Sequence, residues 1–210
     1  MSSVVKYSTI EKTFLGFGSV APSFFVLSVA FSVIINPDYN QIEHTVSILA
    51  SDLMKYPFIV ITGIIVYGLG VLPLGWMLYK TFFQSKIMLL VAFSTILYGL
   101  SSILAAIFKT ASTKEIFNGI TESSTHDFFA LLVLIGIAFS MLLTGFYLIK
   151  INYAKTFSAF SLFMVCITII FAVIFEINPY PEIRGLIQRV VFISTLSWVQ
   201  VAYFRMLLQK

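Results

Sequence analysis

Six long apolar runs limit most strongly what this chain can fold into. They lie near residues 14–35, 58–79, 87–108, 128–149, 157–177 and 186–208. A helix needs about 20 apolar residues to cross the hydrocarbon core of a bilayer, so each run is long enough to span it. Lipid cannot satisfy open backbone polar groups, and continuous runs of this length indicate helices. The sequence therefore predicts an all-α fold, a bundle of six transmembrane helices.

The composition agrees with a lipid environment. Hydrophobic residues make up 59% of the 210 positions and charged residues only 10%, whereas a soluble domain averages about 25% charged residues. The six runs leave little other chain, so residues 1–210 are expected to form a single integral membrane domain. The first run is longer than a signal-peptide core and no A-x-A site follows it, which predicts a retained span. Cys166 has no second cysteine to pair with and is expected to be inert.

The distribution of lysine and arginine predicts the orientation. Six spans place both ends of the chain on one side. That side carries eight basic residues and one acid, whereas the other carries five basic residues and eight acids. The positive-inside rule then places both termini in the cytoplasm. The basic residues are scattered at helix ends, which favours membrane lipids as partners and argues against nucleic-acid binding. Low arginine usage with abundant isoleucine, phenylalanine and lysine indicates an AT-rich prokaryotic genome, and hence a bacterial inner (plasma) membrane.

The first outer connection, residues 36–57, contains the patterned stretch "HTVSILASDLMKYP". Residues at helical spacing give it two faces. The apolar face comprises Ile42, Val46, Leu49, Ala50 and Leu53, and the polar face comprises His44, Ser47, Ser51 and Lys55. Turn and cap residues precede this stretch and Pro57 ends it. The pattern predicts a short amphipathic helix lying at the outer interface.

Several polar side chains are expected at this same outer depth, on four separate segments. They are His44, Ser47, His126, Asp127, Glu176, Arg184, Gln188 and Arg189. Ionisable residues near a membrane usually face a bundle interior or a watery cavity, so the set predicts a shared polar pocket. Arg184 and Arg189 would hold a phosphate there, because a guanidinium can do so bidentately.

Structural interpretations of the same residues stay open. His44 would then only cap or decorate the interfacial helix, and His126-Asp127 would form a helix start whose acid complements the helix dipole. Glu176 would form an ion pair with Arg184 or Arg189 that joins the fifth and sixth spans.

Three sequence segments resemble a known family. They are "HTVS" in the first outer connection, "HDFFALLV" at the start of the fourth run, and "GLIQRVVFISTLSWVQVAYFRML" in the last run. Together they resemble the six-span family catalogued as domain of unknown function 998. The layout is more distantly similar to the eukaryotic Frag1/DRAM/Sfk1 group, which is linked with lipid handling. The resemblance implies a fold and a membrane location, and it assigns no role to any residue.

The leading functional hypothesis is binding of a lipid headgroup or a small anionic ligand in the outer pocket, with no cofactor expected. An alternative is a metal-assisted hydrolase or transferase, with zinc bound by His44, His126 and either Asp127 or Glu176. No local ligand pair such as H-E-x-x-H supports that alternative. A Ser47 nucleophile beside His44 lacks a G-x-S-x-G elbow. A transporter is a second alternative, although the middles of the spans carry almost no charge.

Overall fold

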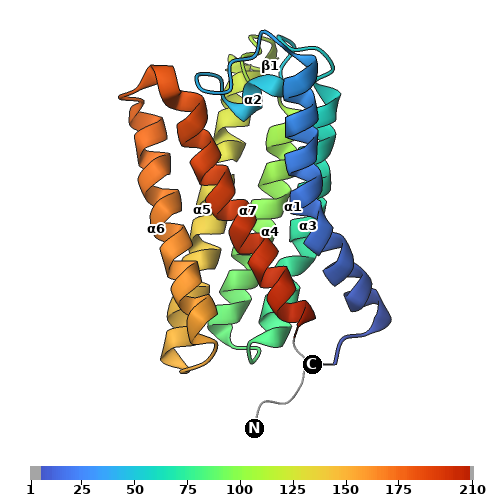
Figure 1. Ribbon diagram of the computed structural model, residues 1–210, viewed down its shortest axis with the longest axis vertical. Helices are drawn as coiled ribbons and strands as arrows, with labels where there is room; N and C mark the ends of the chain where they lie inside the picture. Colours follow the sequence, from blue (N-terminus) through green and yellow to red (C-terminus); the bar gives the residue numbers. More distant parts are fainter. Residues whose placement is uncertain (1–5, 209–210) are drawn as a thin grey trace.

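The computed structural model describes residues 6–208 and contains the six long helices that the sequence predicts (Figure 1). Each is long and apolar enough to cross a membrane. They are α1 (Thr9–Ile35), α3 (Phe58–Thr81), α4 (Lys86–Ile107), α5 (Glu122–Lys150), α6 (Lys155–Ile177) and α7 (Arg184–Leu207). The predicted fold class is confirmed. Lys210, which was counted with the inner basic residues, lies outside the described residues.

Two of the helices begin five and six residues before their predicted apolar runs. α1 starts at Thr9 because Ser8 and Glu11 form a capping box, in which each side chain accepts a hydrogen bond from the other residue's backbone N–H. α5 starts six residues before the predicted 128 because Thr121 and Ser124 cap it in the same reciprocal way. A capping box satisfies backbone donors that a helix start leaves free. The apolar runs therefore located the spans but not their polar ends.

The helices form a ring in which each packs against the next in the chain, and α7 returns to contact α1. The start of α1 and the end of α7 lie at one end of the bundle, shown at the bottom of Figure 1. We call this the terminal end; it also carries the short connections 82–85 and 151–154. The opposite, distal end carries the connections 36–57, 108–121 and 178–183.

Small residues and paired hydroxyls hold the ring together inside. A Cβ atom added at Gly75 of α3 would lie 2.6 Å from the carbonyl oxygen of Ala92 in α4, so only glycine permits this backbone contact. Buried hydroxyls pair across neighbouring helices because an unpaired polar group in an apolar interior costs free energy. The pairs are Tyr67–Tyr98 at 2.7 Å, Thr95–Ser140 at 2.9 Å and Thr168–Ser194 at 2.7 Å.

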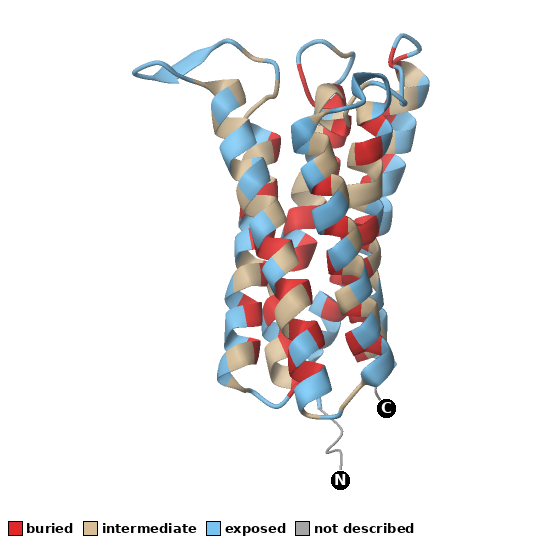
Figure 2. Cartoon of the chain, turned by 90° about the vertical axis from the view of Figure 1, so that its left-hand side faces the viewer, coloured by how far each residue is buried: buried red, intermediate tan, exposed pale blue. Residues whose placement is uncertain are grey.

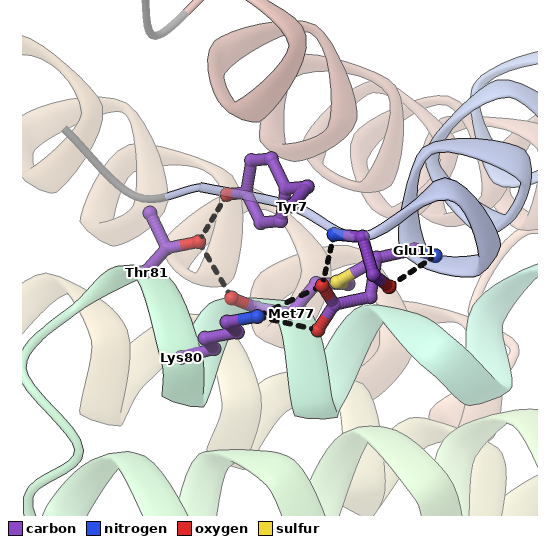
Figure 3. A network of polar contacts seen from close by, with 6 residues as sticks. Tyr7, Glu11, Met77, Lys80 and Thr81 are labelled. Carbon is purple, nitrogen blue, oxygen red and sulfur yellow. Dashed lines mark hydrogen bonds and ion pairs between the residues drawn. The ribbon is translucent and has the colours of Figure 1, made fainter.

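The start of α1 is fixed to the end of α3 at the terminal end of the bundle (Figure 3). The Lys80 ammonium donates to both carboxylate oxygens of Glu11, at 2.7 and 2.8 Å. Nearby, the hydroxyls of Tyr7 and Thr81 lie 2.7 Å apart, and Thr81 donates to the Met77 carbonyl at 2.6 Å. These contacts join the residues before α1 to the last turn of α3, although more than 60 residues separate them in the chain.

The first distal connection differs in detail from the predicted amphipathic helix. The helix it contains, α2, spans only Val46–Leu49, with turns on either side. Of the predicted apolar face, Val46, Leu49 and Ala50 are buried, but Ile42 is 49% exposed and Leu53 is 68% exposed. The Asn36 side chain accepts from the backbone N–H of Lys55 at 2.7 Å and donates to its carbonyl at 3.3 Å. These bonds close the connection into a compact loop. A longer straight helix could not bring Lys55 back to Asn36 in this way.

The second distal connection forms a β-hairpin that the sequence analysis did not predict. Its strands are β1 (Glu115–Phe117) and β2 (Ile120–Thr121), which pair antiparallel. Asn118 and Gly119 connect the strands, with φ angles of 40° and 84°. Two residues with positive φ are typical of the type I′ hairpin turn. The last distal connection is a single 3₁₀ turn, η1 (Pro181–Ile183), which leads directly into α7.

Candidate functional site

The first distal connection docks on the N-terminus of α7. The backbone N–H groups of Gly185 and Leu186 donate to the carbonyl oxygens of Glu43 and Ile42, both at 3.1 Å. The first N–H groups of a helix have no partner within the helix, so the loop carbonyls satisfy donors that would otherwise be free. No side chain fits between the two segments at Gly185. A Cβ there would clash with the carbonyl oxygen of His44 and lie 2.8 Å from those of Gln41 and Ile42.

Arg189, one turn further along α7, grips the same loop. Its Nη1 donates to the carbonyl oxygens of Gln41 at 2.6 Å, Gly185 at 2.9 Å and His44 at 3.2 Å. Its Nη2 donates to the Tyr39 hydroxyl at 2.8 Å. The positive charge is thus surrounded by neutral protein oxygens, and no carboxylate is among them.

Tyr39 links the guanidinium to the loop backbone. Its side chain is buried, and its hydroxyl lies 3.0 Å from the carbonyl oxygens of both His44 and Thr45. Burial raises the pKa of the Tyr39 hydroxyl, and the hydrogen bond and positive charge of Arg189 oppose that rise only in part. The hydroxyl therefore keeps its proton at neutral pH and can donate it to a carbonyl.

Gln188 completes the contact by capping α2. Its Oε1 accepts from the backbone N–H of Val46 at 2.7 Å, and its Nε2 donates to the Ser47 hydroxyl at 3.4 Å. We call the whole arrangement the distal latch. It consists of Tyr39, the carbonyls of residues 41–44, Val46, Ser47, Gly185, Leu186, Gln188 and Arg189.

The two histidines make different hydrogen bonds. His44 Nδ1 accepts from the backbone N–H of Asn40 at 3.2 Å, so a neutral His44 ring carries its proton on Nε2. His126 Nδ1 lies 2.7 Å from the Ala105 carbonyl and 2.9 Å from that of Phe108, at the end of α4. Carbonyl oxygens only accept, so His126 carries a proton on Nδ1, and in the neutral ring Nε2 is an acceptor. His44 can therefore donate to an anion, whereas neutral His126 cannot.

Of the eight predicted site residues, the structure brings four together at the latch: His44, Ser47, Gln188 and Arg189. His126 instead caps α4, and α4 and α5 are not the ring neighbours of α7. Asp127 and Glu176 are exposed. Within residues 6–208, no three His, Cys, Asp or Glu side chains gather as a group that could hold a metal ion. The described residues therefore offer no set of ligands for the zinc ion of the alternative hypothesis.

Arg184 is the remaining predicted site residue. Its guanidinium carbon lies 4.6 Å from the centre of the Phe175 ring on α6, and its Nε is buried without a hydrogen-bond partner. The ion pairs among the described residues are Lys80–Glu11 and Lys109–Asp52. The expected pairing of Glu176 with Arg184 or Arg189 is therefore wrong, because one guanidinium faces an aromatic ring and the other faces carbonyls.

Tyr39, Gly185 and the loop carbonyls belong to the contact, although none of them is among the predicted site residues. Backbone carbonyls carry no residue-specific signal, so no pattern of side chains could have located them. Gly185 was the one available clue, because it stands just before the predicted run 186–208 and at the second position of α7, where glycine is a poor helix former without a close contact to explain it.

Comparison with known families gives a match over most of the chain. The family model described as "Protein of unknown function (DUF998)" matches residues 19–205. That range runs from α1 to the last turn of α7 and includes every residue of the distal latch. Neither the curated proteins nor the solved structures contain a match to the chain.

Proposed function

The chain belongs to the DUF998 family of proteins of unknown function, and we propose that it binds the phosphate of a lipid headgroup, or a small anion of like chemistry, at the distal end through Arg184. The single observation that carries this proposal is the state of that guanidinium. Its charge sits at the border of a membrane span, and it has neither a carboxylate nor a carbonyl partner among the described residues.

The chemistry of arginine makes an external anion the natural partner. A guanidinium does not lose its proton in proteins, so its charge must be met by an anion, by water or by an aromatic face. The Phe175 ring covers one face of the Arg184 guanidinium and leaves the planar edge with its N–H donors. A phosphate can bind two of these donors at once.

Neighbouring polar groups can add to the site. Gln188 lies four residues after Arg184 and so shares its side of α7, and its amide contacts the Ser47 hydroxyl. The N–H that His44 carries on Nε2 is a further donor for a phosphate oxygen. Arg189 has a different part in the proposal. It holds the loop that presents Ser47 and His44, and its contacts with carbonyls leave it little capacity for a ligand.

The predicted orientation belongs to the same proposal. With both termini in the cytoplasm of a bacterial cell, the distal end would face outward and meet headgroups of the outer leaflet. Labelling of single cysteines in a Cys166→Ala background tests this. An impermeant thiol reagent added to intact cells should reach position 118 in the hairpin turn and not position 83 between α3 and α4. The reverse pattern would place Arg184 at the inner leaflet.

Lipid-dependent thermal stability tests the binding itself. The purified protein is measured in detergent alone, then with phosphatidylglycerol, with diacylglycerol, which lacks phosphate, and with inorganic phosphate. Wild-type protein should gain melting temperature with phosphatidylglycerol and not with diacylglycerol. A gain with inorganic phosphate alone would identify a small anion as a sufficient ligand.

Two variants separate ligand binding from folding. Arg184→Gln should keep the melting temperature of the lipid-free protein and lose the gain from phosphatidylglycerol. Lys109→Gln is the matched control, because it removes a distal cation that already pairs with Asp52, and it should keep the full gain. An Arg184→Gln protein that gains as much as wild type would exclude Arg184 as the phosphate ligand.

A further inference from the structure

The β1–β2 hairpin carries an apolar surface that the bundle does not cover. Ile116, Phe117 and Ile120 are 46%, 65% and 50% exposed. Phe117 pairs directly with Ile120 across the two strands, and directly paired residues point to the same face of a hairpin. A distal connection made only to join two spans needs no large apolar side chains at its tip.

The base of the hairpin fixes its direction. The Ser112 hydroxyl donates to the Glu122 carboxylate at 2.8 Å, and the Glu122 backbone N–H donates to the Lys114 carbonyl at 2.8 Å. At the turn, the Gly119 backbone N–H donates to the Glu115 carboxylate at 2.7 Å. The hairpin is therefore held as a unit against the first turn of α5.

Figure 2 shows that the hairpin extends sideways, beyond the outline of the helices, and does not fold back over the distal end. Below it, α5 presents a stripe of exposed apolar residues at helical spacing, which includes Phe128, Leu131 and Ile135. In a spanning helix such a stripe faces lipid. The exposed face of the hairpin thus continues a surface that already lies against the bilayer.

The height of the hairpin fits the boundary of the membrane. Six polar or small residues, Glu122 to Asp127, separate the hairpin from the first lipid-facing residue, Phe128. At 1.5 Å per residue they raise its base by roughly 9 Å. The headgroup region beyond each side of the hydrocarbon core is about 5–8 Å thick. The base of the hairpin therefore lies at about the outer edge of the headgroup region, and side chains that reach from there toward the bilayer enter this region and not the bilayer centre.

From these observations we infer that the β1–β2 hairpin is a lateral membrane anchor, which inserts Phe117, Ile120 and Ile116 among the lipids of the leaflet at the distal end. The occupant of this apolar surface is lipid, and neither a protein partner nor a second copy of the chain is required. The anchor is independent of the Arg184 site, because the hairpin is fixed to α5 whereas Arg184 lies on α7 against α6.

An environment-sensitive fluorophore tests the anchor. In a Cys166→Ala background, the protein is labelled with a nitrobenzoxadiazole group at Phe117→Cys, or separately at Ile120→Cys, and placed singly in phosphatidylcholine nanodiscs. The matched control is Thr113→Cys, an exposed position just before the hairpin. Emission from positions 117 and 120 should lie about 10 nm or more to the blue of position 113, as expected for a site out of water.

Quenching identifies what surrounds the fluorophore. Phospholipids with a nitroxide at a shallow acyl position should quench positions 117 and 120 at least twofold more than position 113, and aqueous iodide should show the opposite order. If iodide quenches all three positions equally, the hairpin lies in water and the inference fails. A blue shift without nitroxide quenching would mean that protein covers the hairpin, which also overturns the lipid anchor. Neither outcome bears on whether Arg184 binds phosphate.

Discussion

Replacing Gly185 by alanine should break the distal latch, although the same change elsewhere in a helix usually stabilises. The added Cβ would meet the backbone carbonyl oxygens of Gln41, Ile42 and His44. No side-chain rotation can relieve a clash with backbone, so the loop must move away from α7. That movement breaks the backbone hydrogen bonds from Gly185 and Leu186 and the bonds from Arg189 to the loop carbonyls.

The expected loss follows from these bonds. Each backbone hydrogen bond contributes about 1 kcal/mol net, and a bond from a charged group about 1.5–3 kcal/mol. The half-exposed position of Arg189 favours the lower value for its share. The higher helix propensity of alanine offsets up to about 1 kcal/mol of this loss. The free energy of unfolding should therefore fall by about 2–4 kcal/mol.

Gly16→Ala is the matched control for this prediction, because Gly16 lies in α1 and a Cβ there would meet nothing within 4 Å. Thermal unfolding in detergent should show a lower melting temperature for Gly185→Ala and an equal or higher one for Gly16→Ala. Amide hydrogen exchange should accelerate at least about tenfold in residues 40–56, since 1.4 kcal/mol corresponds to a factor of ten, and stay unchanged in α4. If both variants are equally stable, the loop does not depend on its contact with α7 and the reasoning is refuted.

Three further predictions concern single contacts. Glu11→Gln removes the charge that meets Lys80 at the terminal end, and in urea unfolding it should lower the free energy of unfolding by about 1 kcal/mol. Asp52→Asn breaks the pair with Lys109, in which the Asp52 side chain is 69% exposed. It should change the free energy of unfolding by less than about 0.5 kcal/mol in the same assay. His126→Ala leaves carbonyls at the end of α4 without their donor and should lower the free energy of unfolding by about 1–2 kcal/mol. It should not change the stabilisation by phosphatidylglycerol. Loss of that stabilisation would mean that His126 belongs to the binding site. Trp198→Phe should cost about 1 kcal/mol in the same unfolding assay, because it leaves the buried Ser161 hydroxyl without its donor.

The fold was predictable to the extent that it depends on burial in lipid. Runs of about 20 apolar residues located all six spans, because no other environment accepts them. The helix ends were not predicted, since Ser8–Glu11 and Thr121–Ser124 extend the helices through polar sequence that hydropathy does not register. The hairpin was missed although Asn118-Gly119 between apolar residues is a strong hairpin signal. Its strands are only three and two residues long, too short for an alternating pattern to appear.

The sequence indicated the depth of the candidate site in the membrane but not its contacts. Charge and position placed eight polar residues at one end of the bundle, and four of them meet at the latch. Helical periodicity failed in residues 36–57 because the two side-chain bonds of Asn36 to the Lys55 backbone determine the path of the loop. Contacts of that kind depend on tertiary structure, and a single sequence contains no separate sign of them.

The two arginines of α7 show why the chemistry of a site cannot be assigned from residue type and depth alone. Arg184 and Arg189 lie five residues apart at the same end of one helix, and the sequence treats them as equivalent phosphate ligands. They differ in the number of uncharged oxygen acceptors that surround each guanidinium. The 36–57 loop turns three acceptors toward Arg189 and the Gly185 carbonyl of α7 adds a fourth, so its charge is stabilised without any anion. Arg184 faces an aromatic ring, which meets its charge on one side only. A guanidinium whose donors are already accepted acts as a structural group, and one whose donors stay free is available to an anion. The latch thus fixes the loop by engaging Arg189, and the proposed phosphate site rests on Arg184, whose donors the latch does not engage.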